Sequence, residues 1–274
     1  MVSITEIENF WTRGDLHSRI HQAMSLSGLN QKKLEIEDLF PIDQYHARGI
    51  GATVDLGKRM PIRENQSILD IGCGLGGPAR YYAKKFKCHI TGIDITPSFI
   101  EIGNEFNKLT SMSSMVELNV GNGEKLEFKK EIFDGAYSQH VTMNISDRIK
   151  FFSEAYRVLK KGSFFAFTEH GLGPTGNPIF PLPWADNQDM SFLLQPKETV
   201  TLLKEIGFIN IKLIETADKY IEGYEKLIQK QPKSEKPTLG IHVIGGSSMH
   251  ERSINSMQSI KENRTLPFEI VCEK

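Results

Sequence analysis

The sequence has 274 residues, enough to bury a full hydrophobic core as one large domain or as one domain with an appended cap. Its 33 Lys and Arg residues are balanced by 34 Asp and Glu residues, so no net field attracts nucleic acid or an anionic membrane. The three cysteines form neither a disulfide framework nor a metal-ligand spacing. No apolar run approaches the roughly 20 residues that cross a bilayer, and the first residues lack a signal-peptide pattern. We therefore expect a cytoplasmic protein with no metal site, no nucleic-acid partner and no integral membrane contact.

The first 60 residues are mixed in polarity and are predicted to form an N-terminal helical cap. Apolar side chains recur there at steps of mostly three or four residues, the spacing of one face of a helix. The side chains that share this predicted helix face are Trp11, Leu16, Ile20, Ala23 and Met24.

From residue 61 onward, apolar strand patterns alternate with helical stretches. Strands are predicted at 67–71, 89–93, 115–120, 133–138, 163–168, 207–214 and 265–272. Because parallel strands need crossover connections, this alternation favours a seven-stranded, mostly parallel sheet with helices on both faces. We interpret residues 61–274 as one α/β domain that follows the cap of residues 1–60.

The most informative stretch is residues 68–80, where an apolar strand ends in an acid and breaks into a glycine-rich turn before a predicted helix. Gly72, Gly74 and Gly77 match the G-x-G-x-x-G spacing, which lets backbone N–H groups approach a nucleotide. That spacing alone does not decide between a dinucleotide and another nucleoside. Asp70 would repel a pyrophosphate and favours a ligand that carries a positive group.

A second acid follows one strand–helix–strand unit later. Asp94 closes the second predicted strand and lies 24 positions after Asp70. A carboxylate at that place can accept two hydrogen bonds from a ribose diol. The alternative is an acid that only terminates the strand in a turn.

The run at 68–80 resembles motif I of the class I S-adenosylmethionine-dependent methyltransferases. Segments at 42–49, 139–145, 180–185 and 191–193 are similar to small-molecule methyltransferases of the sarcosine/dimethylglycine N-methyltransferase type. The resemblance implies a Rossmann-like fold with lid insertions, S-adenosyl-L-methionine as the cofactor and S-adenosyl-L-homocysteine as the product. It also implies in-line methyl transfer to a small-molecule acceptor, with an amine favoured and a hydroxyl as the other choice.

Carried onto this sequence, the resemblance implies a set of cofactor-binding residues: Tyr45, Gly49, Asp70, Gly72, Gly74, Arg80, Asp94, Ile95, Asn122, Gly123 and Gln139. One position departs from the family pattern. The family usually has an aspartate that accepts from the adenine amino group where this sequence has Asn122. An amide carbonyl can accept the same bond without charge, and a plain Gly-Asn-Gly turn is the other interpretation.

The candidate catalytic residues are His140, Tyr45 and His46. His140 follows the fourth predicted strand, where a neutral imidazole can accept a proton or orient a nucleophile; a structural histidine is the alternative. Tyr45 and His46 lie in a cap segment that closes over the cofactor in related enzymes, although packing of the cap explains each of them as well.

Two later segments are expected to shape the acceptor site. Residues 171–196 are rich in Gly, Pro and aromatic residues and are predicted to form a loop that selects the acceptor. Residues 221–261 are expected to form a lid or a homodimer contact, with a surface loop at 232–237. Two other functions stay open at this stage: an NAD-linked oxidoreductase, which the glycine spacing permits, and a non-catalytic S-adenosylmethionine-binding protein.

Overall fold

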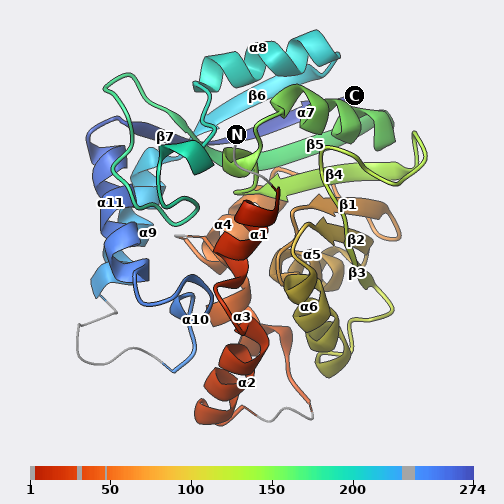
Figure 1. Ribbon diagram of the computed structural model, residues 1–274. Coiled ribbons are helices and arrows are strands. Elements are labelled where there is room, and N and C mark those ends of the chain that lie inside the picture. The colour runs from red at the N-terminus through yellow and green to blue at the C-terminus, as the bar shows by residue number, and fades with distance from the viewer. Residues whose placement is uncertain (1–3, 30–32, 47, 230–237) are drawn as a thin grey trace.

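The computed structural model describes residues 4–29, 33–46, 48–229 and 238–274 (Figure 1). The surface loop predicted at 232–237 lies outside the described residues. Within the described ranges, every helix is too short or too polar to span a membrane.

A seven-stranded sheet forms the centre of the molecule (Figure 1). Its strands are β1 (Ser67–Ile71), β2 (His89–Asp94), β3 (Val116–Val120), β4 (Phe133–Gln139), β5 (Leu159–Leu172), β6 (Ile209–Glu215) and β7 (Thr265–Glu273). The strand order is β3-β2-β1-β4-β5-β7-β6, and of the described strands only β7 runs in the opposite direction to the other six. The predicted seven-stranded, mostly parallel sheet is confirmed.

Strand β5 is longer than the predicted 163–168. It continues to Leu172 because β7 pairs with it along its whole second half, up to the Leu172–Thr265 pair. The segment predicted as a loop at 171–196 therefore begins inside a strand, and it ends where the next helix starts at Pro196. Between them lies a single short 3-10 helix, η2 (Gln188–Met190).

Helices cover both faces of the sheet (Figure 1). Successive residues of β1 contact opposite layers: Ile68 packs in the cluster that contains Tyr82 of α5, whereas Leu69 packs in the cluster that contains Phe151 of α7. The two layers explain why the buried strands are apolar on both sides. The helices that form them are α4 (Ile50–Gly57), α5 (Gly77–Phe86), α6 (Pro97–Leu109), α7 (Arg148–Val158) and α8 (Pro196–Ile206).

The cap begins with α1 (Ile4–Thr12), α2 (Leu16–Leu26) and α3 (Ile36–Asp43). The prediction that Trp11 shares one helix face with the apolar residues after it is wrong. The chain leaves the helix at Arg13 and Gly14, both with positive φ, and the Asp15 side chain caps a new helix by accepting from the Ser18 N–H. Both helices nevertheless pack into one apolar cluster with α6.

The C-terminal part adds α9 (Ala217–Gln229), α10 (His242–Gly245) and α11 (Met249–Lys261). Helices α9 and α11 pack against each other and against β7, while α10 contacts α1 and α2 of the cap. The described part of the predicted segment 221–261 therefore runs from the sheet to the cap. Its role as a lid or a homodimer contact stays a prediction.

Candidate active site

The glycine turn after β1 is held by the end of β2. Gly72 and Gly74 have φ of 82° and 52°, and a Cβ on Gly72 would lie 2.2 Å from a methyl group of Val141. The Gly72 N–H donates to the Ile93 carbonyl at 2.8 Å, and the Gly74 N–H donates to the Asp94 carboxylate at 2.9 Å. The turn therefore has one conformation that only glycine at position 72 permits.

Asp94 is bonded through both carboxylate oxygens. One accepts from the Gly74 N–H and the other from the Thr96 N–H, each at 2.9 Å. Burial raises the pKa of Asp94 above its usual value, and these hydrogen bonds oppose the shift. Each oxygen retains a further lone pair for a ligand hydroxyl.

A cavity of about 180 Å³ lies at the carboxyl ends of β1, β2 and β4, where the strand order reverses. This is the place at which open α/β sheets bind ligands. Of the predicted site residues, the structure brings together around this cavity Tyr45, His46, Asp70, Gly72, Gly74, Asp94, Ile95, Asn122, Gly123, Gln139 and His140.

Arg80 does not line the cavity, because its guanidinium is fully buried beneath the glycine turn. It donates to Asp43 of the cap at 3.0 Å, to the Leu75 carbonyl at 2.6 Å and to Asn107 at 2.8 Å. The expectation that Arg80 contacts the cofactor is therefore replaced by a structural role. Arg80 ties the cap, the turn and α6 together.

Gly49 also lies outside the cavity lining. It is the N-cap residue of α4, with φ of 48°, and its N–H donates to the His46 carbonyl at 2.8 Å, so it orients the segment that carries His46. Gly77 has a packing role: a Cβ there would lie 2.6 Å from the Asp43 side chain. The third glycine of the motif thus lets the cap approach α5 closely.

Three side chains that line the cavity bury polar atoms without a hydrogen-bond partner among the described residues. These atoms are Asp43 Oδ1, His46 Nδ1 and Gln139 Nε2. Buried polar groups are nearly always paired, so unpaired ones at a cavity indicate a ligand that completes them. Together with the glycine turn and Asp94, these three unpaired polar atoms fit a polar nucleoside ligand.

Asp70 is the acidic residue at the end of β1, and it is buried. The Tyr137 hydroxyl donates to its carboxylate at 2.7 Å. Burial raises the pKa of Asp70 to about 8, the Tyr137 hydrogen bond opposes this shift, and the nearby Asp94 adds to it. A positive ligand group would supply the missing counter-charge.

Asn122 lines the cavity and also builds its own turn. Its side-chain oxygen accepts from the Glu124 N–H at 2.8 Å. The two interpretations of this residue are therefore compatible, because an amide oxygen has a second lone pair and the amide nitrogen can donate.

A second, smaller cavity of about 30 Å³ adjoins the first. Tyr45, His46 and His140 line both cavities, so they form the boundary between them. No lysine, arginine or carboxylate lines the second cavity within the described part of the chain. The rest of its wall is aromatic, aliphatic or weakly polar: Met143, His170, Pro183, Trp184, Tyr224, Leu227, Ile241, Met249 and Ser253.

Three of these residues form a histidine cluster. The His140 ring centroid lies 5.6 Å from that of His46 and 5.5 Å from that of His170. Burial lowers the pKa of His46 to about 4, of His170 to about 3 and of His140 well below 6.5, and Arg48 adds to the shift at His46 and His140. All three imidazoles are therefore neutral at pH 7.

Tyr220 of α9 holds the imidazole of His140. Its hydroxyl hydrogen-bonds to His140 Nε2, and its ring lies against both His140 and His170. Sequence reasoning missed His170 and Tyr220. His170 lies between the predicted strand at 163–168 and the predicted loop at 171–196, and Tyr220 comes from a helix 80 residues after His140.

The Tyr45 hydroxyl points toward α11, where it donates to the Met249 sulfur at 3.0 Å. Its ring meets Trp11 edge-on at 5.4 Å between centroids. Burial raises the pKa of Tyr45 well above 10, so the phenol is neutral. Tyr45 therefore packs the cap across the cavity boundary and is not placed as a base.

The fold and the cavity resemble those of a class I S-adenosylmethionine-dependent methyltransferase domain. Its sheet differs from the 3-2-1-4-5-6 order of dinucleotide-binding sheets, because the antiparallel β7 stands between β5 and β6. Residues 69–167 match the family model described as a methyltransferase domain. The resemblance to class I methyltransferases is confirmed, and the oxidoreductase alternative is set aside.

One curated protein and two solved structures illustrate what this chain is similar to. The methyltransferase phqN of Penicillium fellutanum is 36% identical over 114 residues, which cover 42% of this chain and 35% of that protein. Phosphoethanolamine N-methyltransferase 2 of Haemonchus contortus superposes with a TM-score of 0.79 at 20% identity, over 100% of this chain and 60% of that one. A Galdieria sulphuraria protein described as a sarcosine dimethylglycine methyltransferase superposes with a TM-score of 0.65 at 18% identity, over 82% of each chain. The matches thus span about a third of the curated relative and 60% of the Haemonchus chain.

Proposed function

We propose that this protein transfers the methyl group of S-adenosyl-L-methionine to a small-molecule amine. One observation carries the proposal: the cavity at the glycine turn meets a second, uncharged cavity at Tyr45, His46 and His140. S-adenosyl-L-methionine bound in the first cavity would present its methyl group at that boundary to a methyl acceptor in the second cavity. Two structurally similar proteins are named for phosphoethanolamine and for sarcosine dimethylglycine. These compounds are amines, so the names support an amine as the methyl acceptor.

The bound cofactor supplies an electrophilic methyl group, and the chain supplies binding and orientation. Asp94 would accept from the ribose hydroxyls, Asp70 would pair with the amino group, and Asn122 with Gly123 would border the base. Holding two reactants in line in a water-poor pocket accounts for a large part of such catalysis. Transfer converts the sulfonium to a thioether, and the amine nitrogen gains the methyl group and later loses a proton.

The second cavity narrows the chemistry of the acceptor. Its walls hold three neutral histidines and no cation among the described residues, so a carboxylate or phosphate bound there would have no cation in direct contact. An apolar wall also favours the neutral form of an amine, which is the form that attacks. We therefore favour an uncharged, largely apolar amine over glycine-derived or phosphorylated ones.

Replacing His140 by alanine tests this arrangement. We expect kcat/KM for the amine to fall by about a hundredfold, because the imidazole that orients the acceptor N–H is lost, while the affinity for S-adenosylhomocysteine stays near that of the wild type. Titration calorimetry measures the affinity for S-adenosylhomocysteine. A methyl-transfer assay measures kcat/KM on matched amines with and without a carboxylate or phosphate. His89→Ala, at an exposed position on β2, is the matched control.

Absence of saturable S-adenosylhomocysteine binding would refute the proposed function. Binding without transfer to any amine of the panel would favour the non-catalytic alternative. Equal activity of His140→Ala and wild type would remove His140 from the mechanism.

The raised pKa of Asp70 predicts a pH-dependent cofactor affinity. Below pH 8 the carboxyl of the free protein is mostly protonated, so pairing with the ligand ammonium requires loss of that proton. Affinity for S-adenosylhomocysteine should therefore rise from pH 6.5 to pH 8 by roughly tenfold. Calorimetry should show a much flatter profile for Asp70→Asn; an equally steep one would assign the titration to another group.

A further inference from the structure

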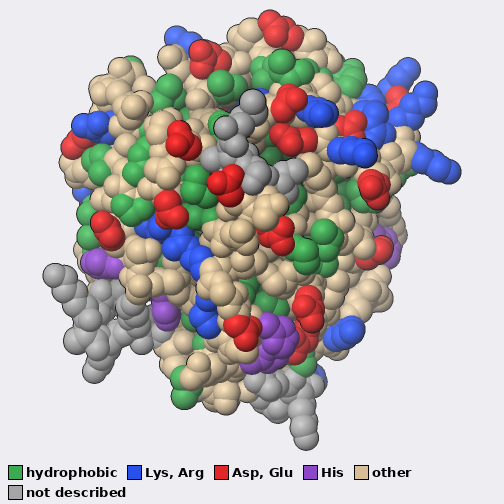
Figure 2. All heavy atoms as spheres, viewed as in Figure 1, with side chains coloured by type: hydrophobic (Ala, Val, Ile, Leu, Met, Phe, Trp, Pro, Cys, Tyr) green, Lys and Arg blue, Asp and Glu red, His purple; other side chains and the backbone are tan. Residues whose placement is uncertain are grey.

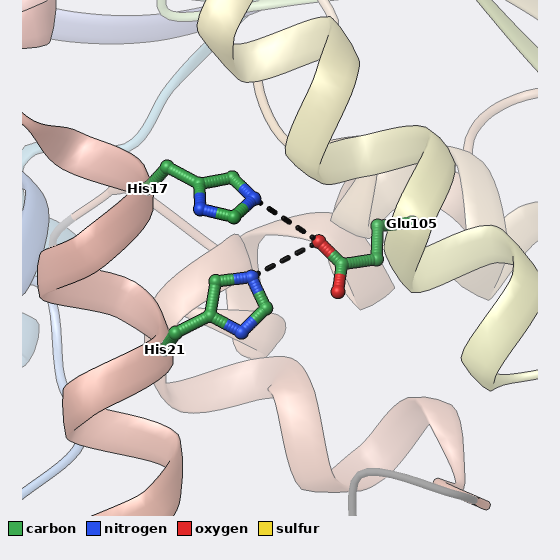
Figure 3. Close-up of side chains that lie close together, drawn as sticks. All are labelled: His17, His21 and Glu105. Atoms are coloured by element: carbon green, nitrogen blue, oxygen red, sulfur yellow. Dashed lines mark hydrogen bonds and ion pairs between the residues drawn. The ribbon is translucent and has the colours of Figure 1, made fainter.

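Helices α2 and α6 bring two histidines and a glutamate together at the surface (Figure 3). His17 and His21 lie four residues apart on α2 and therefore on the same helix face. Both point toward Glu105 of α6, with Nε2 atoms 3.5 Å and 3.0 Å from the same carboxylate oxygen. All three potential ligand atoms lie within 4.8 Å of one another.

We propose that His17, His21 and Glu105 form a binding site for a divalent transition-metal ion of the zinc type. Zinc takes nitrogen and oxygen ligands in a tetrahedron at about 2.0–2.2 Å, which separates neighbouring ligand atoms by about 3.3 Å. The two measured nitrogen–oxygen separations lie on either side of that value. Small side-chain rotations would bring the three ligands onto one ion.

The ligand set selects the kind of metal. Two imidazoles and one carboxylate suit zinc, cobalt, nickel or copper, whereas magnesium and calcium prefer a shell of oxygens. The side chains of His17, His21 and Glu105 are 46%, 27% and 36% exposed, so an ion can reach them from solvent and complete its shell with water. In Figure 2, histidine and acidic side chains gather on the surface over this part of α2 and α6.

The proposed metal site lies between the N-terminal cap and the sheet domain. Helix α2 belongs to the cap, whereas α6 begins shortly after Asp94 in the sheet domain. An ion held by both helices would cross-link the cap to that domain, beside the apolar cluster in which Met24 of α2 and Phe106 of α6 already pack. Such a link is independent of the proposed methyl transfer and exists whether or not the chain is a methyltransferase.

The test is metal binding by the untagged chain at pH 7.5. We expect one zinc ion per chain by calorimetry, visible absorption bands of a four-coordinate site with cobalt, and a raised melting temperature in zinc but not in magnesium. His21→Asn and Glu105→Gln should each weaken zinc binding by about tenfold or more, since even loss of a group that only supports a metal ligand costs that much. His89→Asn removes an exposed histidine elsewhere and should bind like the wild type.

A second control separates this site from the buried histidine cluster. His140→Asn should keep zinc affinity and the increase in melting temperature. The proposal is overturned if no saturable zinc binding is found, if His21→Asn binds like the wild type, or if His140→Asn abolishes binding. Folding of each variant is checked by its melting temperature without metal.

Discussion

Arg80→Met is expected to destabilise the protein by about 3–5 kcal/mol, the usual cost of removing one partner from a buried ion pair. The Arg80 side chain is 0% exposed, and its Asp43 partner is 1% exposed. Burial already raises the pKa of Asp43, and Arg80 is the main influence that opposes the shift. Without it, Asp43 must take up a proton or stay charged in an apolar setting. Urea unfolding measures the change.

Two controls accompany this measurement. Lys84→Met removes another cation of α5, but one that is 44% exposed and pairs with exposed glutamates, so a loss below about 1 kcal/mol is expected. The double variant Arg80→Met/Asp43→Leu removes both charges and should recover part of the lost stability. Equal stability of Arg80→Met and wild type would contradict the role assigned to the pair.

Asp94→Ala is expected to weaken S-adenosylhomocysteine binding by about 10- to 100-fold. The change removes the proposed acceptor of the ribose hydroxyls, and hydrogen bonds to charged groups contribute about 1.5–3 kcal/mol. It also frees the Gly74 and Thr96 N–H groups, so the turn loses its fixed conformation. Titration calorimetry provides the affinity.

Asp134→Ala is the matched control for Asp94→Ala. Asp134 also accepts from a backbone N–H, that of Ser67, and pairs with Lys160, but it lies at the opposite, amino end of the strands. Its loss should lower stability slightly without changing the ligand affinity. Unchanged affinity in Asp94→Ala would remove that residue from the site.

The sequence predicted the sheet well, because strand patterns are local and the glycine turn follows β1 directly. Most of the site residues that it predicted line the first cavity, since the carboxyl ends of parallel strands meet at one edge. Arg80 was misassigned because its spacing places it after the turn, whereas only the packed structure shows Asp43 below it.

The missed features depend on contacts between distant segments. His170 joined His140 only because β5 continues beyond the predicted strand, and Tyr220 reaches them from α9. The separation of His17 and His21 is visible in the sequence, but their partner Glu105 lies 84 residues after His21. Pattern analysis cannot join such residues, because loop lengths and helix packing determine their proximity.

The position of β7 has a consequence during synthesis. This strand is the last of the described strands along the chain, yet it pairs with both β5 and β6. Domains fold from their N-terminal side as the ribosome adds about 5–20 residues per second. Strands β1 to β5 can align early, but β6 has no partner until residues 265–273 leave the ribosomal tunnel. A nascent chain halted before residue 265 should therefore expose the edges of β5 and β6 to chaperones and to aggregation.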